Sequence, residues 1–195
     1  MPDMLRDGGG SGNLAKVNSD GNLITRSISV DQRLESAVDE EAYYEVTTGV
    51  QTLTDSAETP MVYLKNTRTD GFVIVLDRFF FDIWTSTSGT GQGTLKYYRN
   101  PTVTGGTAIT PVNTNYGSTS SATGTFTRTQ TTMSGGTVWW TESISNPDSV
   151  AREEGRIVIP PGSSHGVSLA APTSNSSMAV SMNIAFYYLD PDLIR

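Results

Sequence analysis

The sequence contains no cysteine and only one histidine, His165. The lack of cysteine excludes thiol nucleophiles, zinc–thiolate sites and iron–sulfur clusters, and it means that folding does not depend on an oxidising compartment. A single histidine cannot build a metal site from several imidazoles. His165 follows Pro160-Pro161-Gly162 and precedes Gly166, so we expect a turn residue rather than a catalyst. Its replacement by Asn or Gln should then change stability by less than about 0.5–1 kcal/mol.

Basic residues and long apolar runs are also scarce. The chain of 195 residues has 13 Lys and Arg against 20 Asp and Glu, a net charge of −7. The basic residues are scattered singly, at positions that include Arg68, Arg78, Lys96, Arg99, Arg128 and Arg152. A nucleic-acid partner would need clustered cations, so none is expected. No apolar run approaches the length of a membrane span, and the first residues lack the apolar core of a secretory signal, so we expect no membrane partner.

The carboxylates offer no paired site by their spacing. Asp39-Glu40-Glu41 and Glu153-Glu154 are adjacent residues, and neighbours on a strand point to opposite faces. We therefore interpret them as solvated charges and expect no enzyme and no catalytic residues, although a carboxylate-based glycoside hydrolase remains an alternative.

Segments that suggest bound ions or nucleotides have simpler explanations. Residues 18–22 and 190–192 carry acidic and amide side chains, but turn chemistry explains them as well as calcium does. The glycine-rich residues 89–93 and 105–107 lack the lysine or the following helix of a phosphate-binding loop. No metal and no cofactor are expected.

The remaining composition favours strands joined by turns. Thr, Ser, Val, Ile and aromatic residues dominate, and the pattern predicts strands over residues 23–30, 42–53, 61–66, 72–84, 95–99, 124–128, 138–140, 156–159, 165–170 and 178–189. We expect a bulge at Gly49, a hairpin turn at residues 69–71, and one or two helical turns within residues 32–41. Residues 85–137 should hold long exposed loops that do not pack against the core. This pattern predicts an all-β, jelly-roll-like antiparallel β-sandwich.

The chain is expected to have two parts. Residues 1–20 contain the run Gly8-Gly9-Gly10-Ser11-Gly12 and are predicted to form a flexible N-terminal arm, either a docking arm or a frayed terminus. Residues 21–195 should form the sandwich domain.

Paired aromatic residues recur along the predicted strands, namely Tyr43-Tyr44, Tyr97-Tyr98, Trp139-Trp140 and Tyr187-Tyr188. Alternation predicts that each pair puts one ring inward and one outward. The outward rings are either ordinary surface or anchors at a subunit or sugar interface. Together with the apolar density of residues 72–84, they lead us to expect a homo-oligomer, a trimer in particular.

Several segments resemble small virion proteins of tailed bacteriophages. They are Gly21-Asn22-Leu23-Ile24-Thr25-Arg26, Glu41-Ala42-Tyr43, the residues 106–115 and 122–126, and Ile157-Val158-Ile159-Pro160-Pro161-Gly162-Ser163-Ser164. The last is similar to the ending of jelly-roll virion domains.

The resemblance implies a capsid decoration protein, made in the host bacterial cytoplasm, that binds the outside of the head shell. Its partner would be the lattice of the major capsid protein, and no catalytic residues are implied. The alternative is a tail-fibre or receptor-binding module that contacts host surface glycans.

Overall fold

The chain divides into two compact units, Met1–Asp31 and Gln32–Arg195. The computed structural model describes residues 4–6, 14–17, 23–24, 41–53, 57–86, 92–145, 149–170 and 178–190. The first unit holds a three-stranded antiparallel sheet of β1 (Met4–Arg6), β2 (Leu14–Val17) and β3 (Leu23–Ile24). A flexible arm over residues 1–20 stays a prediction. The expected helical turns lie outside the described residues except for Glu41, as does the expected strand beyond residue 24.

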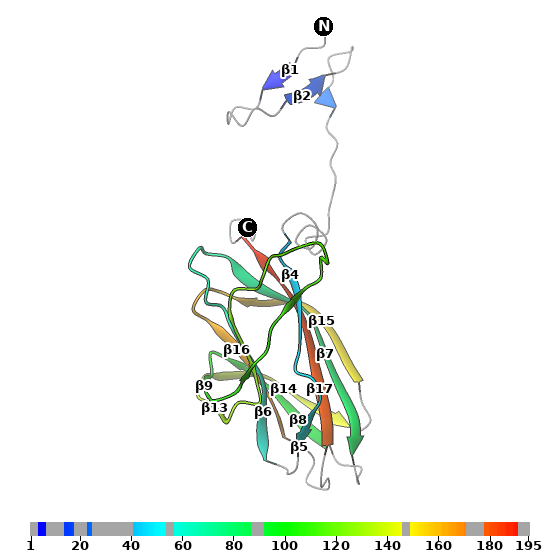
Figure 1. Ribbon diagram of the computed structural model, residues 1–195, viewed down its shortest axis with the longest axis vertical. Coiled ribbons are helices and arrows are strands. Elements are labelled where there is room, and N and C mark those ends of the chain that lie inside the picture. Colours follow the sequence, from blue (N-terminus) through cyan, green and yellow to red (C-terminus); the bar gives the residue numbers. More distant parts are fainter. Residues whose placement is uncertain are drawn as a thin grey trace. The chain divides into compact units, whose positions relative to one another are not determined.

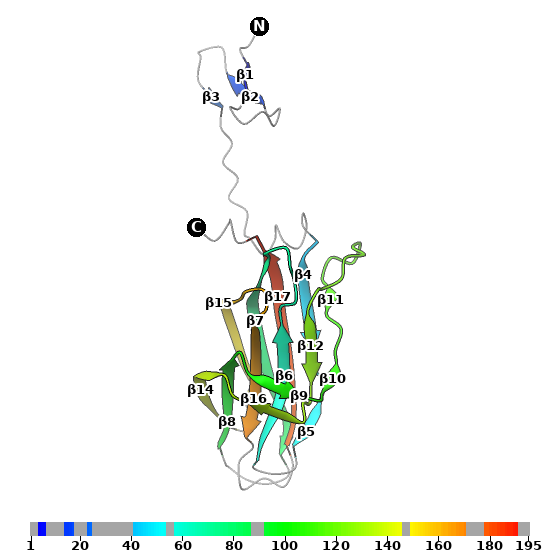
Figure 2. The same cartoon turned by 90° about the vertical axis from the view of Figure 1, so that its left-hand side faces the viewer.

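The second unit is built from eight long strands in two antiparallel sheets (Figures 1 and 2). In chain order they are β4 (Tyr43–Thr47), β6 (Glu58–Lys65), β7 (Val73–Ser86), β8 (Gln92–Arg99), β14 (Thr137–Ser145), β15 (Ser149–Ile159), β16 (Ser164–Ala170) and β17 (Met178–Leu189). The first sheet contains β4-β17-β7-β15 and the second contains β6-β16-β8-β14. In chain order these are strands 1-8-3-6 and 2-7-4-5, which is the connectivity of a jelly roll. The predicted fold class is confirmed.

An insertion between β8 and β14 extends both sheets at one side of the sandwich. It carries β9 (Thr102–Thr104), β10 (Thr107–Ala108), β11 (Val112–Asn113), β12 (Thr125–Arg128) and β13 (Thr132–Ser134). Strand β12 pairs with β6, and β11 pairs with β4. Phe126 is buried in the core, and Ile109 and Ala122 pack against it. The expectation that the loops of this region do not pack is therefore wrong.

The core lies between the sheets, and β7 and β17 are central strands of the first sheet. Leu76, Phe79 and Phe81 face the core, whereas Val73 and Val75 belong to a second apolar cluster on the opposite face. Leu76 and Phe79 are three residues apart and would point to opposite faces of a regular strand. A β-bulge brings both to the core face, because Leu76 pairs with Phe186 and Arg78 pairs with Ala185, which leaves Asp77 as an extra residue. The strand predicted over residues 72–84 is confirmed as β7, and most of its described side chains are buried, although Arg78 is exposed. Because one copy buries this segment, its apolar content alone does not require an oligomer.

Two predicted turns had different outcomes. Thr47 of β4 pairs with Asn183, whereas Gln51 of β5 (Gln51–Leu53) pairs with Val180. The three residues 48–50 therefore lie opposite the two residues 181–182, and the bulge predicted at Gly49 is confirmed. The turn at residues 69–71 joins β6 of the second sheet to β7 of the first, so the predicted hairpin is wrong. Turn residues alone cannot distinguish a hairpin from a connection between two sheets, because only tertiary packing decides whether the flanking strands pair.

The described residues include no helix, and hence none long and apolar enough to cross a membrane.

The packing of the insertion can be tested at Gly124. A Cβ there would lie 2.8 Å from the Lys65 carbonyl oxygen and 2.8 Å from the buried ring of Phe126. We expect Gly124→Ala to lower the free energy of unfolding by about 1–3 kcal/mol, as overpacking does. Gly117→Ala is the matched control, since its Cβ would be 3.5 Å from the nearest atom, Asn115 Oδ1. Chemical denaturation measures both, and equal effects of the two substitutions would contradict the packing.

Candidate functional site

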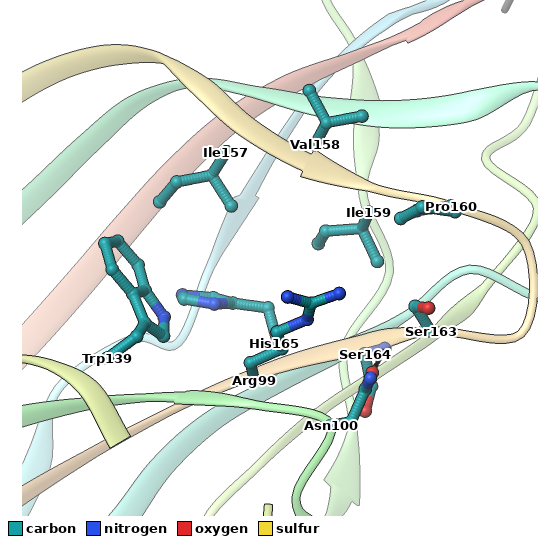
Figure 3. Close-up of a pocket in the computed structure, with 10 residues that line it drawn as sticks. All are labelled: Arg99, Asn100, Trp139, Ile157, Val158, Ile159, Pro160, Ser163, Ser164 and His165. Carbon is teal, nitrogen blue, oxygen red and sulfur yellow. Dashed lines mark hydrogen bonds between the residues drawn. The ribbon is translucent and has the colours of Figure 1, made fainter. Parts of the chain in front are cut away.

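A pocket of about 420 Å³ opens between the edge strands β14 and β15 (Figure 3). The second sheet and its turns contribute Arg99, Asn100, Trp139, Ser163, Ser164 and His165, and β15 and its end contribute Ile157, Val158, Ile159 and Pro160. In the jelly roll, β14 and β15 are consecutive strands that end the two sheets on the side away from β10 and β11. The pocket therefore joins polar groups of one sheet to an aliphatic wall of the other.

His165 lies at the base of this pocket and is only 2 % exposed. It belongs to β16, where it pairs with Leu64 on one side and with Arg99 on the other. Its ring centroid is 6.1 Å from those of Tyr97 and Trp139. His165 was expected to be a turn residue that can be replaced at little cost. It is not a turn residue, because the turn lies at residues 161–162, β16 begins at Ser164, and His165 is buried within that strand.

The Nε2 atom of His165 is buried and has no hydrogen-bond partner among the residues that the structure describes. Burial lowers the pKa of the imidazole from 6.5 to about 4, because the charged form would lose its hydration. The ring is therefore neutral at pH 7, and the pocket contains a polar atom without a partner. Buried polar atoms in native proteins usually have a partner, so this one is the most informative feature of the site.

A β-bulge in β14 interrupts the strand alternation at its two tryptophans, of which Trp139 lines the pocket. Val138 pairs with Tyr98 and Trp140 pairs with Tyr97, so Trp139 is the extra residue. The two indole centroids lie 6.4 Å apart, and the Trp139 centroid is 5.9 Å from that of Tyr97, which faces the core. The predicted alternation of this pair is wrong, because a bulge shifts the face on which the following side chains lie.

The three tyrosine pairs alternate as predicted. Tyr44, Tyr97 and Tyr188 face the core between the sheets. Tyr43 and Tyr187 lie on the opposite face in the second apolar cluster, with ring centroids 6.2 Å apart. Tyr98 points away from the core and is only 9 % exposed, so none of the outward tyrosines is available as a surface anchor. The tryptophans remain exposed.

Exposed apolar side chains gather on the two edge strands that border the pocket, and two of them, Trp139 and Val158, line it. Val138, Trp139, Trp140 and Val158 are each between 41 and 45 % exposed. All four lie on the edge strands β14 and β15. Exposed aromatic side chains concentrated at one edge are typical of a recognition surface.

Arg99 and Asn100 lie at the end of β8 and complete the polar part of the pocket. The Arg99 side chain is exposed and makes no ion pair or hydrogen bond within the described part of the chain. Asn100 adopts a left-handed conformation with φ of 52°. Its Oδ1 accepts a hydrogen bond of 2.8 Å from the Ser164 backbone N–H, which ties the end of β8 to the start of β16.

The carboxylates considered above do not join this site. Glu41 accepts a hydrogen bond from the Ser118 hydroxyl, and its backbone carbonyl accepts one of 2.6 Å from Asn113 Nδ2, so it holds the insertion against β4. Asp39 and Glu40 lie outside the described residues, and for Glu153 and Glu154 only the backbone, in β15, is described. No cluster of three or more His, Asp or Glu residues that could hold a metal ion occurs among the residues whose placement is described.

A second polar cluster lies on the outer face of the second sheet. The Glu58 carboxylate accepts hydrogen bonds from Lys96, Tyr98 and Ser168. Burial raises the pKa of Glu58, but these three hydrogen bonds outweigh it and hold the pKa below its ordinary value. All its members are paired with one another, so the cluster is a structural tie between β6, β8 and β16.

Comparison with known proteins does not assign a family. No protein-family model matches the chain, and no curated protein matches its sequence.

The burial of His165 predicts a pH dependence of stability. The unfolded chain takes up its proton near pH 6.5 and the folded chain only near pH 4, so stability is complete above pH 6.5 and falls as the pH drops through this window. The loss approaches about 3 kcal/mol at its largest. His165→Phe keeps a ring but cannot titrate, so guanidinium unfolding should show a shallower loss between about pH 6.5 and 5. Identical slopes for both proteins would contradict the burial.

Proposed function

We propose that this protein is a structural component of a tailed-phage virion that decorates the outside of the capsid shell. Three observations support the proposal. The sandwich has jelly-roll connectivity, the chain divides into a small N-terminal unit and the sandwich, and the sandwich carries an ordered aromatic patch on its edge strands. The division into two units is the observation that supports the proposal most, because one unit can bind the capsid while the other remains on the particle surface.

In this proposal the N-terminal unit, Met1–Asp31, binds the lattice of the major capsid protein. A second attached unit can bind a neighbouring subunit of the lattice and adds binding area to any contact that the sandwich makes. The area buried between neighbouring capsid subunits raises the free energy needed to open the shell. Such a role needs neither catalysis nor a cofactor.

Capsids that lack this protein provide the test of attachment. The full chain is expected to bind them, and a chain lacking residues 1–31 is expected to lose most of its occupancy while keeping the circular dichroism spectrum of a folded β-sandwich. Unchanged occupancy would show that the sandwich itself makes the contact and would contradict the assigned role of the N-terminal unit.

We further propose that the protein assembles as a homotrimer through the outer face of the edge strand β14 at Val138, which pairs with the outward-facing Tyr98 and does not line the pocket. This strand is at the end of its sheet, and Val138 lies exposed on it. Edge strands with exposed apolar side chains readily pair with another chain.

Light scattering should give a trimer mass, and Val138→Lys should shift it toward the monomer by placing a charge at the contact. Val112→Lys is the control, because Val112 is also an exposed valine on an edge strand, β11, at the other side. A wild-type monomer mass at every concentration would contradict the trimer.

A tail-fibre or receptor-binding module is the second candidate, and the pocket beside Trp139 favours it. Aromatic rings and unpartnered polar groups in one concave site are typical of ligand recognition. Immunogold labelling of intact particles separates the candidates, since decoration predicts label over the head and receptor binding predicts label on the tail.

A further inference from the structure

We propose that the pocket between β14 and β15 binds an acidic saccharide, a sugar ring that carries a carboxylate. The proposal gives a ligand class to the pocket that favours the receptor-binding candidate. It does not depend on head or tail location, because binding to the free protein tests it.

The buried Nε2 of His165 is the first reason. His165 lines the pocket, and its Nε2 has no hydrogen-bond partner among the described residues, which leaves a polar atom unpaired at the base of the pocket. A neutral imidazole nitrogen pairs well with a hydroxyl group, which can donate or accept according to the tautomer. A ligand that brings a hydroxyl to this position recovers a hydrogen bond that the protein alone does not make.

The second reason is the aromatic wall. Trp139 is held by Tyr97 and His165, whose ring centroids lie 5.9 and 6.1 Å away, and it still exposes 42 % of its surface. An indole face carries partial negative charge and attracts the polarised C–H groups of a sugar ring. Ile157 and Ile159 of β15 point toward Trp139 and His165 and form an aliphatic wall opposite the indole, so a ring with apolar faces and a polar rim fits between this wall and Trp139.

Arg99 supplies the charge selectivity. It lines the same pocket and has no acidic partner within the described part of the chain. The guanidinium fork matches a carboxylate in geometry and can form two parallel hydrogen bonds with it. The volume of about 420 Å³ lies in the range of small-ligand sites.

Nuclear magnetic resonance on the full chain can follow the indole N–H signals. Methyl β-glucuronide and N-acetylneuraminic acid are the acidic probes, and methyl β-glucoside is the neutral match. We expect saturable shifts of the Trp139 and Trp140 signals with at least one acidic probe, and at least about tenfold weaker binding of the glucoside. No saturable shift with either acidic probe, or equal affinity for glucoside and glucuronide, would overturn the proposal.

Two pocket variants and one control outside the pocket assign the roles of the residues. Arg99→Gln should reduce glucuronide affinity at least about tenfold, to the level of the glucoside. Arg78→Gln removes the same charge from an ion pair with Glu45, outside the pocket, and should leave affinity unchanged. His165→Phe should weaken both acidic and neutral sugars; if this variant does not fold, the Arg99 and Arg78 variants still decide the matter. Equal affinities in the two arginine variants would overturn the proposal.

A protein carboxylate is the competing source of the same charge. N-acetylglutamate amide tests it, because it carries a carboxylate without a sugar ring. We expect it to bind at least about tenfold more weakly than the best acidic sugar. Equal binding would show that the pocket takes an acidic peptide side chain and would overturn the saccharide assignment.

Discussion

The packing of two apolar sheet faces against each other is the interaction on which the rest of this structure depends. Strands β7 and β17 bring most of the apolar side chains of the first sheet, and β6 and β16 face them from the second. A sandwich of this kind has two sides at which the sheets end. The insertion after β8 extends both sheets at one side, and β14 and β15 end them at the other. The pocket is a consequence of this asymmetry.

The local geometry of the pocket follows from two departures from regular strands. The bulge at Trp139 places this indole in the wall of the pocket, and the left-handed Asn100 ties β8 to β16 beside His165. Burial keeps the imidazole neutral, with its pKa at about 4. A neutral ring with one unpartnered nitrogen suits the recognition of a hydroxyl group. It does not suit proton transfer at pH 7, which needs a pKa near the working pH.

Much of the fold follows from the sequence because strand alternation and turn residues are local signals. The strands ending at Ile159 and Leu189 and the bulge at Gly49 were predictable in this way. The hairpin expected at residues 69–71 failed because the two flanking strands belong to different sheets. The site was harder to predict, since Arg99, Trp139 and Ile157 come from three strands and meet only after the sheets pack. The paired tryptophans were a sequence signal, but no residue pattern marks the bulge that turns both to one side.

The position of His165 at the base of the pocket is the central structural claim. It is also simple to measure, because the chain has a single histidine and so a single pair of imidazole carbon-bound proton signals. A proton nuclear magnetic resonance titration of the full chain should show these signals unchanged between about pH 7.5 and 5.5, with a midpoint near the pKa of about 4. A midpoint near the ordinary value of 6.5 would show that the imidazole is solvated, and would contradict both its burial and the site built around it.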